Sequence, residues 1–168
     1  MITSTMRNGL IVAACHVAIV GSLGAKLLVD RATRPRVWAR AAPVDPDLPI
    51  RGRYVRLRVE ADPSAALQTR GSAVVPVALS EQNGRLAAEV DPSSTRNTHA
   101  QVTVRGGVPI AVVTEPLAYF IPEHTIDPSI RRPGEELWVE VTVPRAGAPR
   151  PIRLGVRKDG VLTPLGVK

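Results

Sequence analysis

The chain has 168 residues, of which only 3% are aromatic, 16 are proline and 13 are glycine. This composition excludes long soluble helices and favours strands joined by tight turns. The formal net charge is +7, but the basic residues are spread along the chain without interleaved base-stacking aromatics, which argues against nucleic-acid binding. One cysteine builds neither a disulfide framework nor a thiolate metal site, and the sequence predicts no cofactor.

An apolar run, 10–29, follows a short N-terminal tail, 1–9. At a rise of about 1.5 Å per residue, a helix of this length spans about 30 Å, the thickness of the hydrocarbon core of a bilayer. We therefore predict a single-pass transmembrane anchor that contacts membrane lipid. The alternative is a signal peptide that is cleaved at the small residues 22–24. A lipoprotein signal is excluded, because the apolar run continues well beyond Cys15.

Small and polar residues within the run suggest contact with another helix. Ala14, Ala18 and Ser22 recur every four residues and form a stripe that allows close helix packing, although alanine richness alone also explains the stripe. His16 is expected to face a neighbouring helix. Arginines that follow the run would keep the downstream domain in the cytoplasm, but long domains translocate largely regardless of charge. Charge therefore leaves both topologies open.

Two regions follow the anchor. Residues 30–49 are punctuated by proline and are predicted to form a linker, and residues 50–168 are predicted to form one β domain. In 53–61, apolar and polar residues alternate, which is typical of a strand with one buried face. A short helix is expected in 62–69, with Asp62 as its N-cap.

Hairpin signals recur through the β domain. Pairs of strand-like segments flank the turn residues 83–84, 106–107 and 158–160, which contain glycine and suit a positive φ. The segment 137–143 alternates cleanly between apolar and polar residues. About seven short strands at regular spacing predict an antiparallel β-sandwich or small β-barrel with little helix.

Two motifs of the domain resemble a known family. The stretch 42–46 (APVDP) is followed by 51–59 (RGRYVRLRV), and 118–123 (AYFIPE) lies before the last strands. These motifs resemble the GDYXXLXY family, whose bacterial members carry an N-terminal membrane segment. The resemblance covers most of the chain after the anchor. It implies an extracytoplasmic domain and a multi-span membrane protein as partner, and it implies no chemistry.

The residues of these motifs are the candidates for a binding site. They are Gly52, Arg53, Tyr54, Leu57, Tyr119, Phe120, Pro122 and Glu123. The chain departs from the family pattern at three positions. Arg53 stands where the family has aspartate, Val59 where it has tyrosine, and His124 where it has glycine. Any role that this aspartate has in the family is therefore not assigned to Arg53 of this chain.

Titratable side chains give little support to an enzyme. Glu123, His124 and Asp127 form a compact cluster with the chemistry for a metal site or an acid–base pair, but a loop of solvated charges is the favoured interpretation. A serine–lysine hydrolase needs a lysine base in a dry site. The lysines beyond the anchor are Lys158, in a predicted turn, and Lys168, at the end of the sequence.

We therefore expect no catalytic residues and no metal site. The predicted function is that of a non-enzymatic accessory or interaction protein at the membrane surface. One alternative is an extracytoplasmic module that binds a small ligand or glycan near Arg53, Tyr54 and Tyr119. The other is an uncharacterised hydrolase that uses the cluster at 123–127.

Overall fold

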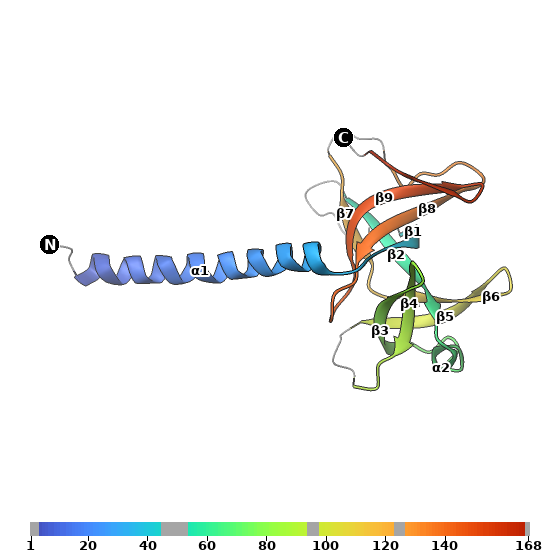
Figure 1. The fold of residues 1–168 in the computed structure, drawn as a ribbon, viewed down its shortest axis with the longest axis horizontal. Coiled ribbons are helices and arrows are strands. Elements are labelled where there is room, and N and C mark those ends of the chain that lie inside the picture. The colour runs from blue at the N-terminus through green and yellow to red at the C-terminus, as the bar shows by residue number, and fades with distance from the viewer. Residues whose placement is uncertain (1–3, 45–53, 94–97, 123–126, 167–168) are drawn as a thin grey trace. The chain divides into compact units, whose positions relative to one another are not determined.

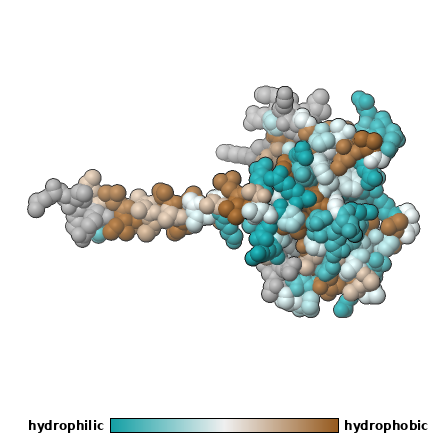
Figure 2. All heavy atoms as spheres, viewed as in Figure 1, coloured by the Kyte–Doolittle hydropathy of each residue, from teal (hydrophilic) through white to brown (hydrophobic). Residues whose placement is uncertain are grey.

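The computed structural model consists of two compact units, residues 1–34 and 35–168. It describes residues 4–44, 54–93, 98–122 and 127–166 (Figure 1). The first unit contains one helix, α1 (Ser4–Thr33). Within it, Asn8–Thr33 is long and apolar enough to cross a membrane, and none of this span is buried. Figure 2 shows apolar side chains along this helix. The predicted apolar span is therefore present, and the helix also includes residues 4–9, which were expected to form a tail.

Polar side chains of α1 bond to the backbone of the same helix. The Nδ1 atom of His16 lies 2.9 Å from the carbonyl oxygen of Val12. The hydroxyl of Ser22 donates to the carbonyl of Ile19 at 2.8 Å. Such internal partners lower the cost of placing polar groups in hydrocarbon, where water is absent. Packing of another helix on Ala14, Ala18 and Ser22 stays a prediction.

The second unit is a β domain with one short helix, α2 (Ala65–Gln68). In the described ranges its strands are β1 (Arg36–Val44), β2 (Tyr54–Pro63), β3 (Val75–Gln82), β4 (Arg85–Val90), β5 (His99–Arg105), β6 (Val108–Val113), β7 (Leu117–Phe120), β8 (Glu135–Thr142), β9 (Arg150–Lys158) and β10 (Val161–Pro164). The prediction of an antiparallel sandwich or small barrel with little helix is confirmed, and the architecture is a barrel.

Six of these strands close the barrel in the order β1, β2, β6, β5, β3 and β4, with β4 returning to β1. Most pairings are antiparallel, but β4 runs parallel to β1 and β2 where it contacts them. The other strands extend this barrel. β8, β9 and β10 continue the sheet from the first half of β1, and β7 pairs with the first half of β2.

Apolar side chains fill the inside of the domain. In β1 the inward residues are Val37, Ala39 and Ala41, and in β2 they include Leu57 and Val59, all with at most 5% exposure. A barrel of few strands has a narrow interior, so alanine and valine fit where larger side chains would not. The interior is therefore a packed core rather than a ligand cavity.

Two local predictions are corrected by the structure. Residues 36–44 were expected to belong to the linker but form β1, because alternate small apolar residues give this segment a buried face despite Pro43. The predicted cap Asp62 lies in β2, and Ser64 caps α2 instead. The Ser64 hydroxyl accepts a hydrogen bond from the N–H of Leu67 at 3.3 Å.

Candidate functional site

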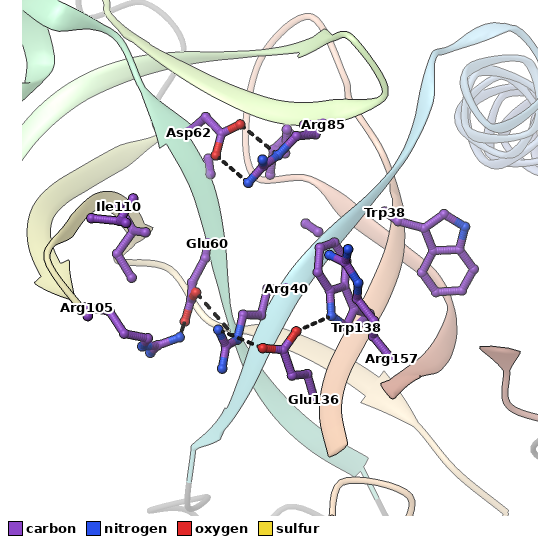
Figure 3. Close-up of a pocket in the computed structure, with 15 residues that line it drawn as sticks. Trp38, Arg40, Glu60, Asp62, Arg85, Arg105, Ile110, Glu136, Trp138 and Arg157 are labelled. Atoms are coloured by element: carbon purple, nitrogen blue, oxygen red, sulfur yellow. Dashed lines mark hydrogen bonds and ion pairs between the residues drawn. The ribbon is translucent and has the colours of Figure 1, made fainter. Parts of the chain in front are cut away.

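A surface pocket of about 430 Å³ lies where β1, β2 and β4 meet. β1 pairs with β2 from Ala41 onward, whereas Trp38 of β1 lies opposite Arg85 of β4. The strands therefore separate at this junction and leave their outward side chains partly uncovered. The β5–β6 turn and the strands β8 and β9 complete the wall (Figure 3). We call this the central pocket.

Glu60 of β2 is the most buried ionic group of the central pocket, with 9% of its side chain exposed. Its Oε1 lies 2.5 Å from Nη1 of Arg105, and its Oε2 lies 3.9 Å from Nε of Arg40. Arg40 also reaches Glu136, with 3.1 Å between Nη1 and Oε1. A carboxylate with so little access to water needs cationic partners, and here they come from β1 and β5. This network joins four strands across the pocket.

A second ion pair lies at the rim of the central pocket. Arg85 of β4 holds both carboxylate oxygens of Asp62, with distances of 2.8 and 2.9 Å. The Arg85 and Asp62 side chains are 67% and 48% exposed, so solvent screens this pair and its contribution to stability is below about 1 kcal/mol. Its geometric effect is to align β2 with β4.

Trp138 supplies one aromatic wall of the central pocket. Its Nε1–H donates to Oε2 of Glu136 at 3.1 Å. The guanidinium carbon of Arg157 lies 5.2 Å from the centre of the Trp138 ring, which is a cation–π contact. Figure 3 shows Arg40, Glu136, Trp138 and Arg157 as one group of side chains from β1, β8 and β9.

Trp38 supplies the second indole and reaches across β8 to β9. A Cβ atom on Gly155 would lie 2.8 Å from Cζ3 of Trp38, so glycine is needed for this approach. Arg153 lies over the same ring, 5.4 Å from its centre, and its Nε–H donates to Glu140 at 2.6 Å. The buried Glu140 thus fixes the arginine that covers Trp38.

Guanidinium groups, carboxylates and indole rings therefore line the central pocket. These groups offer fixed hydrogen-bond donors and acceptors beside aromatic surface, which are the means of binding a polar partner. Among the residues described, no group of three His, Cys, Asp or Glu side chains has the arrangement of a metal site.

The predicted site residues are distributed over several places. Gly52, Arg53 and Glu123 lie outside the described residues, as does His124. Leu57 is fully buried in the core. An inward strand position does not contact a ligand on the surface, and a binding role of the motif residues stays a prediction.

Tyr54 and Tyr119 lie on opposite faces of the sheet that β2 and β7 form. Tyr54 lines a surface pocket of about 350 Å³, and its ring centre is 6.1 Å from that of Phe120 on β7. Tyr119 pairs with Val55 in the ladder and packs against the hydrophobic core. The structure therefore brings Tyr54 and Phe120 together but gives Tyr54 and Tyr119 no common pocket. Pro122 is exposed at the end of the described segment.

Asp127 has a local structural role. Its Oδ1 accepts hydrogen bonds from the backbone N–H and the hydroxyl of Ser129, at 2.8 and 2.7 Å. This arrangement closes a turn before β8. Because 123–126 are outside the described residues, the predicted cluster with Glu123 and His124 stays untested.

Sequence reasoning missed Arg40, Glu60, Trp138 and Arg157 as site residues. The sequence predicts the outward orientation of two of these four residues. Glu60 and Trp138 lie on the polar faces of the alternating segments 53–61 and 137–143. The sequence did not indicate which strands would be neighbours. Arg40 lies in the predicted linker, so the sequence did not predict that this segment forms one side of the central pocket.

A histidine–carboxylate pair lies on β5 and the segment after β6. Nδ1 of His99 is 3.0 Å from Oε1 of Glu115, and the backbone N–H of His99 donates to Oε2 at 3.2 Å. Partial burial raises the pKa of Glu115, but hydrogen bonds from His99, from the backbone of Glu115 itself and from Thr114 together outweigh it, so this pKa is lowered from its ordinary value. The pair ties the start of β5 to the end of β6.

Comparison with known proteins matches the chain to a family model. The family model described as GDYXXLXY protein matches residues 17–154, which run from the middle of α1 to β9. No curated protein and no solved structure matches the chain.

Proposed function

The chain belongs to the GDYXXLXY family, and from its apolar helix and filled barrel we propose that it is a non-enzymatic, single-pass membrane protein whose β domain binds a partner. In this proposal α1 anchors the domain in the bilayer, and the domain lies on the extracytoplasmic side. The partner is an integral membrane protein that spans the bilayer several times.

The observation that carries this proposal is the position of the central pocket on the outside of a barrel with a packed interior. Fully buried Leu57, Val59 and Val77 occupy the inside of the domain. Arg40, Trp138 and the other polar and aromatic groups face outward around the pocket. A surface of this kind presents its binding groups to a protein partner without a conformational opening.

The properties of α1 support the anchor. The span Asn8–Thr33 has 26 residues and is unburied throughout. A helix that exposes apolar side chains on every side is unfavourable in water and favourable in hydrocarbon. Its length exceeds the roughly 20 residues that a bilayer requires, which allows some tilt.

Affinity purification of the full chain in mild detergent tests the proposal. We expect the wild type to recover a membrane protein in stoichiometric amount, and Arg157→Glu to lose it because the substitution reverses the charge beside Trp138. Arg145→Glu is the matched control, since Arg145 is exposed in the β8–β9 connection and does not line the central pocket. Recovery of the wild type alone and monomeric would refute the interaction proposal.

A reporter fused to the C-terminus tests the topology. Alkaline phosphatase is expected to be active there and a cytoplasmic reporter inactive. The reverse pattern would place the β domain in the cytoplasm and restrict its partners to that side.

A second candidate is a module for a small ligand or glycan. It is favoured by the volume of the central pocket, about 430 Å³, and by the two indoles that line it. Pockets of about 300–1,000 Å³ hold small molecules in other proteins. Titration with a panel of mono- and disaccharides, read by tryptophan fluorescence of the wild type and Trp138→Phe, tests this candidate. If no sugar of the panel caused a saturable change in the tryptophan fluorescence of the wild type, this candidate function would be excluded for those sugars.

A further inference from the structure

We propose that a continuous groove along β1 binds an extended, acidic peptide segment of the partner. This inference rests on the proposed function, because it specifies how the partner is recognised. It is carried by three adjoining surface pockets and by one arginine in each of them that has no carboxylate partner within the part of the chain that the structure describes.

The three pockets adjoin through shared residues. The central pocket shares Arg40, Arg105 and Glu136 with a second pocket of about 340 Å³. The second pocket shares Pro43 and Ser129 with a third, which Tyr54 lines. We call the three together the β1 groove.

The length of the β1 groove fits an extended chain. Its residues on β1 run from Trp38 in the central pocket to Val44 in the third. At about 3.3 Å per residue, these six steps span roughly 20 Å. An extended peptide of about seven residues covers the same distance, whereas a single small molecule fills one pocket only.

Each pocket of the β1 groove contains one arginine without a carboxylate partner among the residues described. In the central pocket Arg157 stacks on Trp138 and makes no ion pair. In the second, Arg131 donates to the carbonyl oxygen of Pro128, and its buried Nε has no hydrogen-bond partner. In the third, Arg56 lines the wall and forms neither an ion pair nor a side-chain hydrogen bond.

These three guanidinium groups differ from the other arginines of the groove. Arg40, Arg85 and Arg105 already hold the carboxylates of Glu60, Asp62 and Glu136. Guanidinium groups that hold no carboxylate in the described structure are therefore spaced along the groove. A guanidinium group binds a carboxylate with paired, charge-assisted hydrogen bonds, so acidic side chains at intervals would complement it.

Acidic residues in the groove favour a peptide over a uniform polyanion. Glu135 lines the second pocket and Asp127 lines the third, and neither forms an ion pair in the described structure. A nucleic acid or sulfated glycan carries negative charge on nearly every unit and would place some of it beside these carboxylates. A peptide can place acidic residues opposite the arginines and neutral residues opposite Asp127 and Glu135.

Selection from a displayed library tests the inference. The full-length protein in lipid nanodiscs is immobilised and exposed to a library of random heptapeptides. We expect enrichment of peptides with acidic residues separated by neutral ones. The triple variant Arg56→Gln, Arg131→Gln and Arg157→Gln is expected to bind the enriched peptides about tenfold more weakly, because each exposed ion pair contributes a factor of about two.

A matched variant controls for total charge. Arg70→Gln, Arg145→Gln and Lys158→Gln remove the same charge from exposed positions that line none of the three pockets, and this variant should bind like the wild type. Should the Arg131 substitution prevent folding, the double variant Arg56→Gln and Arg157→Gln is expected to weaken binding about fourfold.

Several outcomes would overturn the inference. One is that the selected peptides are not enriched in acidic residues. Another is that the groove variant binds the selected peptides as tightly as the wild type does. A third is that the groove and control variants lose the same amount of affinity. Binding of heparin with the same dependence on the groove arginines would replace the peptide by a polyanion. If the groove inference fails while a membrane partner still co-purifies, the proposed function stands and its interface lies elsewhere. If no partner co-purifies, the proposed function fails on its own test.

Discussion

Substitution of Gly155 by alanine tests the arrangement of the two indoles. Gly155 lies on β9, where its backbone faces the ring of Trp38. A Cβ atom at this position would lie 2.8 Å from Cζ3 and 3.0 Å from Cη2 of Trp38, and 3.2 Å from the carbonyl oxygen of Thr163. The ring and the neighbouring strand limit the space on two sides. The indole must therefore move if the substituted chain is to fold.

The magnitude follows from two costs and one effect that partly offsets them. Added volume in a well-packed site costs about 1–3 kcal/mol. Displacing Trp38 also weakens its contact with Arg153, which contributes about 0.5–1 kcal/mol at a partly exposed site. Alanine reduces the entropy of the unfolded chain, which offsets about 0.4–1 kcal/mol, since Gly155 has no positive φ. We expect Gly155→Ala to lower the free energy of unfolding by about 1–3 kcal/mol.

Urea unfolding of the full-length protein in detergent, followed by tryptophan fluorescence, measures this effect. The chain has only two tryptophans, so a displaced indole should also shift the emission of the folded state. Gly166→Ala is the control, because nothing lies within 4 Å of a Cβ at that position. In a Trp38→Val background Gly155→Ala should cost less than in the wild type, since the colliding ring is absent and only the contact with the carbonyl oxygen of Thr163 remains. An equal cost in both backgrounds would refute the proposed contact.

Three further substitutions have defined outcomes. Leu57→Ala should lower the free energy of unfolding by about 2–5 kcal/mol, measured by urea titration, because the side chain is fully buried; a loss under 1 kcal/mol would contradict its core position. Arg105→Gln should destabilise more than Glu60→Gln in the same assay, because it leaves the buried Glu60 carboxylate with Arg40 alone at 3.9 Å, whereas the arginines that Glu60→Gln leaves behind are partly exposed to water; the reverse order would be inconsistent with that network. The lowered pKa of Glu115 means that its ionised form stabilises the folded state above the ordinary pKa and that this contribution is lost as pH falls below about 4.5. The stability difference between wild type and Glu115→Gln, below about 1 kcal/mol at pH 7 because the pair is partly exposed, should shrink as the pH falls below about 4.5, and a difference that grows on acidification would refute the assignment.

Local chemistry along the chain determined the elements of this protein. The apolar run predicts a helix that is long and apolar enough to cross a bilayer, because its length and polarity can both be read from the run itself. The predicted turns at 83–84, 106–107 and 158–160 all contain residues with positive φ, including Asn83 and Asp159. Such turns depend on a few adjacent residues, so the sequence contains the whole signal for them.

The tertiary structure alone decided which strands became neighbours. Arg40 lies directly across from Trp138 in the sheet, although they come from strands near opposite ends of the domain. The segment 36–44 looks like part of a linker because it contains Pro43 and is flanked by Pro35 and Pro46, yet pairing with β2 and β8 makes it a central strand. A period-two pattern says that a strand has a buried face but not which strand covers its edge. The central pocket therefore depends on long-range pairings and closure of the barrel, and these are set by the packing of the whole core.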